Sequence, residues 1–246
     1  MLPELDLAKP DKTRMESAGL FSEMAGEFMK QFVKKYQHAW VLSFGLLYLI
    51  WFAYLERTVT KRYHIMHVSL DDYIPFNEYF IIPYLLWFAY VAVAVAYFFF
   101  TSKEEYYQLC AYLFCGMIIS LIVCSFFHNG TNFRPMIDPD KNLCSWLVAK
   151  LYQADTCTNV FPSVHVYNSV CTHVAIRRSQ KLRQYGWIRI SSFTLMILIC
   201  LATVFLKQHS VIDGVGAGIM AYALYYAVYG TSERLGDKKA ARKAIG

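Results

Sequence analysis

Six apolar segments divide the chain, and each approaches the length that a membrane-spanning helix requires. They cover residues 39–55, 79–100, 106–127, 161–176, 190–206 and 211–229. About 20 apolar residues in a helix cross the hydrocarbon core of a bilayer; the second, third and sixth segments meet this length best, and the others are short. Only 17% of the 246 residues are charged, against about a quarter in soluble domains. We therefore predict an all-α, polytopic membrane protein with six transmembrane helices.

Basic residues gather in the segments that would share one side of the membrane: before the first span, between the second and third, between the fourth and fifth, and after the sixth. They are Lys30, Lys34, Lys35, Lys103, Arg177, Arg178, Lys181, Arg183, Arg189, Arg234, Lys238, Lys239, Arg242 and Lys243. Cytoplasmic loops carry such an excess, so both termini are predicted to be cytoplasmic. The loops 56–78 and 128–160 and the turn 207–210 are then external. Because the net charge of +6 follows this topology and does not cover one face, we predict no nucleic-acid partner.

The predicted spans leave a segment at each end of the chain. Residues 1–37 form a cytoplasmic N-terminal segment, 38–230 the six-span domain, and 231–246 a basic cytoplasmic tail. The pattern over 19–36 fits either an amphipathic helix on the membrane surface or an extension of the first span, and both interpretations stay open. The sequence also leaves the oligomeric state open, and whether residues 1–14 are native.

Two short motifs on the predicted external side carry groups that suit phosphate. In the segment 129–135, Arg134 precedes a proline just beyond the third span. A guanidinium matches phosphate oxygens in a bidentate way; an arginine that anchors lipid headgroups is the alternative. In the segment 161–165, Ser163 and His165 stand where the loop enters the fourth span. Helix N-termini bind anions and a histidine exchanges protons near neutral pH; interfacial packing of the histidine is the alternative.

A third motif, residues 207–213, opens the sixth span. His209 and Asp213 are four residues apart, so on a helix they would share a face. A carboxylate there would fix the imidazole tautomer and leave the second ring nitrogen available as a nucleophile. An aspartate inside a span is costly and by default implies function; a structural pair that ties helices together is the alternative.

The three motifs, in this order and on alternate loops, resemble the signature of the type 2 phosphatidic acid phosphatase (PAP2) superfamily over roughly residues 38–230. That signature has a Lys/Arg-Pro block, a Pro-Ser-Gly-His block and a Ser-Arg block that ends in His-x3-Asp. The resemblance implies a PAP2-like helical bundle and a phosphohistidine mechanism. In it, His209 attacks phosphorus, Asp213 orients His209, and His165 protonates the leaving oxygen, while Arg134 and Ser163 hold the phosphoryl oxygens.

The chain departs from that signature in each block. Phe127 stands where the first block has lysine, Val164 replaces the usual glycine, and residues 202–203 (Ala-Thr) stand where the Ser-Arg pair is expected. Two cationic phosphate ligands are therefore missing, and Lys207 is the candidate to replace one. These changes, together with the stretch 74–87, are similar to the inositol phosphorylceramide synthase branch of the superfamily.

The function expected from this resemblance is a phosphatase of the plasma membrane that hydrolyses lipid phosphate esters at the external face. Its partners would be the lipid phosphate substrate and the surrounding membrane lipids. One alternative is a phosphotransferase that passes a phosphorylceramide- or phosphoinositol-type headgroup to an alcohol; another is a non-enzymatic membrane binding or transport protein. No cofactor is expected. No metal is expected either, because His64 and His67 lack acidic or thiol partners at suitable spacing.

The mechanism also sets a geometric expectation. The third, fourth and sixth spans should pack together, with the rings of His165 and His209 on the order of 5–8 Å apart around a phosphate-sized gap. Arg134 should reach the same gap.

Smaller features complete the prediction. Cys144 and Cys157 share the long external loop, and the sequence leaves open whether they form a disulfide. Gly214 and Gly218 have the spacing of a face for close helix packing. Asp71, with its acidic neighbour, is expected to line the external mouth of the site.

Overall fold

The computed structural model describes residues 24, 26–31, 33–59 and 62–230. The chain divides into two compact units, residues 1–40 and 41–246, and this boundary lies close to the predicted start of the six-span domain. The described residues of the first unit are helical. Residues 1–23, which include the start of the predicted surface helix, and the basic tail 231–246 lie outside the described residues.

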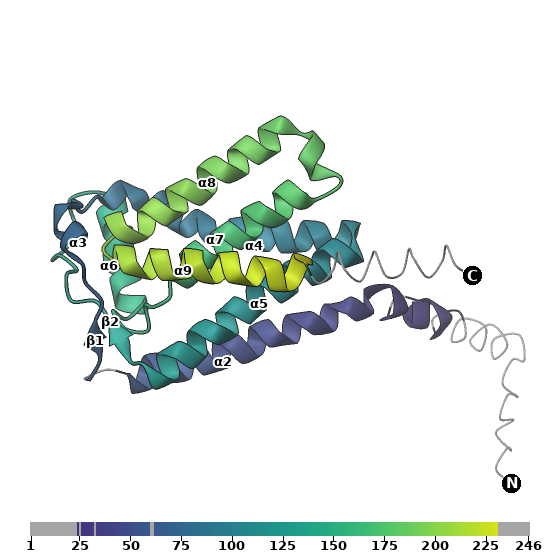
Figure 1. Ribbon diagram of the computed structural model, residues 1–246, viewed down its shortest axis with the longest axis horizontal. Helices are drawn as coiled ribbons and strands as arrows, with labels where there is room; N and C mark the ends of the chain where they lie inside the picture. Colours follow the sequence, from purple (N-terminus) through teal and green to yellow (C-terminus); the bar gives the residue numbers. More distant parts are fainter. Residues whose placement is uncertain (1–23, 25, 32, 60–61, 231–246) are drawn as a thin grey trace, which may run out of the picture. The chain divides into compact units, whose positions relative to one another are not determined.

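Within the described ranges, five helical segments are long and apolar enough to cross a membrane, which indicates an integral membrane protein. They are Gly26–Thr58, Glu78–Thr101, Lys103–Phe126, Gly186–Phe205 and Val211–Gly230. Each overlaps one predicted span. The elements inside them are η1 (Gln37–Leu42), α2 (Ser43–Thr58), η2 (Glu78–Phe80), α4 (Ile81–Thr101), α5 (Lys103–Phe126), α8 (Gly186–Phe205), α9 (Val211–Tyr225) and the π-helical turn η4 (Tyr226–Gly230) (Figure 1).

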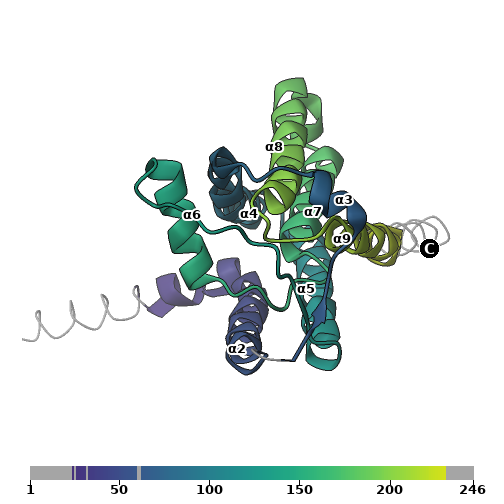
Figure 2. The same ribbon diagram turned by 90° about the vertical axis from the view of Figure 1, so that its left-hand side faces the viewer.

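The segment predicted as the fourth span forms a shorter helix, so six full-length spans are not found among the described residues. This helix, α7 (Val164–Arg178), has 15 residues, about 22 Å at 1.5 Å per residue, against a hydrocarbon core of about 30 Å. It packs against α4, α5, α8 and α9 and lies among them in the end view (Figure 2). A helix surrounded by protein can bury polar side chains such as Asn168 and Thr172, which lipid would disfavour.

Close packing joins α7 to α5 and α9. A Cβ added to Gly116 of α5 would overlap the ring of Tyr167 on α7, whose hydroxyl donates to the carbonyl of Tyr112. The hydroxyl of Tyr112 donates in turn to the carbonyl of Ala221 on α9, at 2.6 Å. Lipid is as apolar as most side chains, so helices in a bilayer are held by tight packing and hydrogen bonds of this kind.

Polar contacts link the helices at both ends of the bundle. At one end, the carboxylate of Glu105 in α5 accepts bonds from the hydroxyl of Ser179 and the amide of Gln180, at 2.9 and 2.8 Å. This end also holds η3 (Leu182–Gln184) and the basic turn between α7 and α8. At the other end, the thiol of Cys124 donates to the carbonyl of Phe161 at 3.3 Å.

Short elements cover the second end (Figures 1 and 2). They are β1 (His64–Ile65), α3 (Ser69–Tyr73), β2 (Asn129–Gly130) and α6 (Leu143–Ala154). The two strands are parallel and pair His64 with Asn129. A Cβ on Gly130 would lie 2.5 Å from the carbonyl oxygen of Cys157, so this crossing of backbones requires glycine. The loops predicted to be external therefore fold together at one end.

Cys144 and Cys157 do not form a disulfide in the structure. All seven cysteines, each within the described residues, are free thiols. Cys144 packs beside the buried Val148 and Leu206, whereas Sγ of Cys157 lies 3.7 Å from the hydroxyl of Tyr63.

The close approach predicted for α9 occurs at a different glycine. Gly218 has no atom within 4 Å of an added Cβ, and Gly214 would make only an ordinary contact of 3.8 Å with Val166. At Gly216, a Cβ would lie 2.5 Å from the ring of Phe161. The prediction of a Gly214–Gly218 packing face was therefore wrong, because the loop before α7 crosses α9 between these two positions.

Candidate functional site

His209 lies in the tight turn between α8 and α9. The amides of Gln208 and His209 both donate to the carbonyl of Thr203, at 3.0 Å, so the turn folds back on the last turn of α8. Lys207 has a φ of 52°, which is uncommon for a residue with a side chain. Ser210 then caps the N-terminus of α9.

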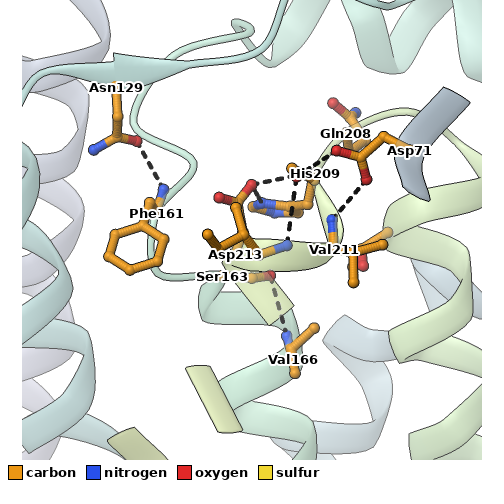
Figure 3. A network of polar contacts seen from close by, with 12 residues as sticks. Asp71, Asn129, Phe161, Ser163, Val166, Gln208, His209, Val211 and Asp213 are labelled. Carbon is orange, nitrogen blue, oxygen red and sulfur yellow. Dashed lines mark hydrogen bonds and ion pairs between the residues drawn. The ribbon is translucent and has the colours of Figure 1, made fainter. Parts of the chain in front are cut away.

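Asp213 approaches His209 through a helix cap. Its Oδ2 accepts the amide of Ser210 at 2.9 Å and lies 3.4 Å from Nδ1 of His209 (Figure 3). The predicted neighbourhood of the two residues is found, but not for the predicted reason: His209 precedes the helix, so the two do not share a helical face. At 3.4 Å the pair is longer than a good N–H···O bond.

His165 is the second residue of α7 and faces His209. The two ring centroids are 5.7 Å apart, at an interplanar angle of 61°, which agrees with the expected separation. On its other sides His165 contacts two aromatic residues of α4, Tyr84 at 4.6 Å and Trp87 at 4.4 Å between centroids. The imidazole is thus held between an aromatic wall and the second histidine.

Ser163 has a structural position. Its hydroxyl caps α7 by accepting the amide of Val166 at 3.4 Å, and its amide donates to the carbonyl of Asp213 at 3.2 Å. This second bond ties the start of α7 to the start of α9 and so relates the two histidines. Ser163 is fully buried and does not line the cavity described below, where it was expected as a phosphate ligand.

Asn129 is a positioning residue that sequence reasoning did not single out. Its Oδ1 accepts the amide of Phe161 at 2.7 Å (Figure 3), and its Nδ2 donates to the carbonyl of Phe127 at 2.7 Å. Its own carbonyl accepts the amide of Asn159 at 2.7 Å. A fully buried amide with this many bonds fixes the loop that leads into α7. The available signal was a polar residue two positions after an apolar span.

Arg134 is held at the same end by carbonyl oxygens. Its terminal nitrogens donate to the carbonyls of Asp155 at 2.8 Å and Thr156 at 2.7 Å, and to the side-chain oxygen of Gln208. The guanidinium lies 4.7 Å above the ring of Tyr152, a favourable cation–π geometry. These contacts come from α6, the following loop and the α8–α9 turn, so the expected link between Arg134 and the His209 turn runs through Gln208.

The structure does not bring Lys207 to the two histidines. Its Nζ donates to the carbonyls of Asp71 at 2.7 Å and Ile74 at 2.5 Å, and it lies 5.6 Å from the ring centre of Phe133. Lys207 therefore binds the C-terminal end of α3. Asp71 is itself buried at the start of α9 and does not line the mouth of the site, as described further below.

One cavity of about 300 Å³ joins the remaining residues. His165, His209, Arg134 and Gln208 line it, together with Asp155 and neighbouring loop residues. Its apolar wall comes from two candidate spans, α2 and α4. The wall residues are Tyr48, Leu49, Phe52, Tyr84, Trp87 and Phe88. The cavity is thus polar where the loops meet and mainly aromatic along α2 and α4.

Six polar atoms of the residues that line this cavity are buried and lack a hydrogen-bond partner among the described residues. They are Nδ1 of His165, Nδ1 of His209, Nε of Arg134, Nε2 of Gln208, Oδ1 of Asn159 and Nε1 of Trp87. Buried donors and acceptors in proteins are almost always satisfied, and exceptions call for an explanation. A ligand with several acceptor oxygens would satisfy two donors at once.

Asp155 is an acidic side chain of the cavity lining, and its pKa is raised. Burial raises the pKa of Asp155 from 3.8 to about 6; Glu56 also raises it, while Arg134 and His209 act in the opposite direction. Asp155 was not singled out from the sequence. No group of three or more histidine, cysteine, aspartate or glutamate side chains in the described part of the chain is placed to hold a metal ion.

Comparisons with known proteins add no relative to this picture: no protein-family model, no curated protein and no solved structure matches the chain.

Proposed function

We propose that the cavity is the active site of a membrane-embedded phosphatase that hydrolyses lipid phosphate esters through a phosphohistidine at His209. The observation that carries this proposal is the convergence of His165, His209 and Arg134 on one cavity, with ring centroids 5.7 Å apart. A phosphorus atom between two imidazoles needs this order of separation for attack on one side and proton transfer on the other.

The proposed reaction has two steps. Nδ1 of His209 faces Asp213 at 3.4 Å, which leaves Nε2 to attack phosphorus. The N–P bond forms, the P–O ester bond breaks, and the leaving oxygen takes a proton from His165. Water then attacks the phosphohistidine; its proton returns to His165, the N–P bond breaks and phosphate leaves. The negative charge of the substrate favours the protonated His165 that the first step needs.

The phosphoryl oxygens would be bound by the unpartnered donors. Nε of Arg134 and Nε2 of Gln208 supply two, and Arg134 is already oriented by the carbonyls of Asp155 and Thr156. The first amides of α7 have no acceptor within their own helix, as at any helix N-terminus, and suit an anion. The chain lacks two cationic phosphate ligands of the PAP2 signature, and we propose that this set of donors replaces them. Gln208 lines the cavity, whereas Lys207 does not.

The substrate is proposed to be a lipid because two candidate spans line the cavity. Tyr48 and Phe52 of α2 and Phe88 of α4 line it, so an acyl chain would lie against aromatic side chains while its headgroup reaches the histidines. We further propose that α7 is the sixth crossing, which places both termini and the basic turn 177–189 in the cytoplasm. The site then faces the external side of the plasma membrane.

Hydrolysis is favoured over transfer to an alcohol by the size of the site. About 300 Å³ is the lower end of the range for ligand pockets, about 300–1,000 Å³. It accommodates a phosphorylated headgroup with a water molecule more readily than two polar headgroups side by side.

The test is phosphate release from a short-chain phosphatidic acid by detergent-purified full-length protein, with and without EDTA. We expect release that is insensitive to EDTA, absent in His209→Ala and retained in His64→Ala. His64 is the matched control because it is exposed and stacks on Phe127, at 4.9 Å, outside the cavity. Activity that survives His209→Ala, or that EDTA abolishes and magnesium restores, contradicts the proposal. Transfer to an added alcohol without phosphate release would instead support the phosphotransferase.

A further inference from the structure

A buried carboxylate from a distant part of the chain holds the start of α9. Asp71, on the short helix α3, is 3% exposed. Its Oδ1 accepts the amide of Val211 at 2.8 Å, and its Oδ2 accepts the hydroxyl of Ser210 at 2.5 Å (Figure 3). Oδ2 also accepts the amide of Val68 at 2.9 Å, which fixes the carboxylate to the start of its own helix.

The same segment receives a second contact from the opposite side of the His209 turn. Nζ of Lys207 donates to the carbonyls of Asp71 and Ile74. The turn is therefore hydrogen-bonded to residues 71–74 on both sides of His209, through Lys207 before it and through Ser210 and Val211 after it. Lys207 also has the uncommon φ of 52°, a conformation that persists only where surrounding contacts hold it.

The carboxylates at the start of α9 also exclude a role for this helix end in binding substrate. Asp213 accepts the amide of Ser210, and Asp71 accepts the amide of Val211. Two negative charges occupy amides that would otherwise attract an anion. These amides are therefore not available to a phosphate, whereas unpartnered donors of Arg134 and Gln208 remain in the cavity lining.

We propose that Asp71 is a positioning residue for His209, acting through Ser210, Val211 and the Lys207 contact to fix the imidazole against the cavity. The inference rests on the proposed function, because it concerns the placement of the proposed nucleophile. A misplacement of about 1 Å of a reacting group can lower a rate about 10²-fold. Loss of the Asp71 bonds should therefore lower kcat, by roughly 10- to 100-fold, and leave KM almost unchanged.

The experiment compares Asp71→Asn with Asp72→Asn in the phosphatase assay. The two carboxylates are adjacent on α3, but Asp72 is exposed and pairs with His67 at 2.8 Å, away from the cavity. We expect the kcat loss only in Asp71→Asn, and we expect Ser210→Ala to add little to it, because both changes break the same bond. Equal kcat values for the two aspartate variants would overturn the inference.

Lys207→Met keeps the proposal testable if Asp71→Asn does not fold. It removes the two bonds to residues 71–74 while keeping the aliphatic side chain beside Phe133. The positioning role predicts a fall in kcat at constant KM. A rise in KM at constant kcat would overturn it and would indicate that Lys207 binds substrate. The failure of the proposed function looks different: wild-type protein would release no phosphate, or would release as much as His209→Ala.

Discussion

The contact between Gly216 of α9 and Phe161, which precedes α7, allows a test of what fixes His165 relative to His209. Gly216→Ala would place a Cβ 2.5 Å from Cε2 and 2.8 Å from Cζ of Phe161, about 1 Å inside the usual 3.5–4.0 Å carbon contact. The backbone of Phe161 cannot easily retreat, because Asn129 and Cys124 bind its amide and carbonyl. The ring or α9 must therefore move.

The expected magnitude comes from comparison with Gly218→Ala. Both substitutions gain the same helix propensity, about 1 kcal/mol, but Gly218 has open space around an added Cβ. Overpacking typically costs about 1–3 kcal/mol. Gly216→Ala should therefore be less stable than Gly218→Ala by about that amount, a difference of roughly 2–12 °C in melting temperature for a chain of this size.

Activity should separate the two variants further. Phe161 lies two positions before Ser163, the residue that caps α7, so its displacement shifts His165 relative to His209. We expect roughly a 10- to 100-fold lower rate of phosphate release for Gly216→Ala and a rate near wild type for Gly218→Ala. The assays are thermal unfolding in detergent and phosphate release on the same preparations. Identical melting temperatures for the two variants would refute the packing argument, whatever the activity shows.

Four further predictions address the topology, the reaction and its pH dependence. Single cysteines placed in the loop 128–160 of a variant without native cysteines should react with an impermeant maleimide in intact cells; reaction only after lysis would reverse the proposed orientation. His209→Ala should abolish turnover, whereas His165→Ala should retain transfer from substrates with very good leaving groups, as a comparison of aryl and alkyl phosphates would show. Asp213→Asn should leave the fold intact and lower the rate by about 10²–10⁴-fold by analogy with other His–Asp pairs; a melting temperature well below wild type would instead indicate a structural pair. The raised pKa of Asp155, about 6 against 3.8, means that wild-type stability falls by up to about 3 kcal/mol as pH rises from about 4 to above 6. Asp155→Asn should remove this dependence, so its melting temperature should match wild type near pH 4 and exceed it at pH 7.

The helical membrane class and five of the six segments could be read from the sequence because apolar length is a local property. α7 could not be read correctly in this way. Hydropathy measures what lipid would tolerate, whereas α7 is surrounded by four helices and can bury Asn168, Ser169 and Thr172. Its start was also placed too early, because Ser163 caps the helix and the residues before it belong to the loop.

In the candidate site, too, the features set by local sequence could be predicted and the long-range contacts could not. His165, His209 and Asp213 stand in short local motifs, so their neighbourhood could be predicted even though the capping geometry of Asp213 was not. The bonds of Arg134 with Gln208, and of Asp71 with Ser210, join residues 74 and 139 positions apart. No local pattern encodes such pairs, because they depend on how the loops at this end of the bundle fold together.

The shortness of α7 has a consequence for how the protein is made. A segment with buried asparagine, serine and threonine, two histidines and two terminal arginines gains little from leaving water for lipid, since only apolar residues contribute favourably to insertion. We therefore expect α7 to enter the membrane together with α8, as a hairpin around the basic turn, and to settle against a bundle that already contains α4 and α5. Synthesis of α8 would then be the event that completes the site, because until α7 is in place His165 has no fixed position.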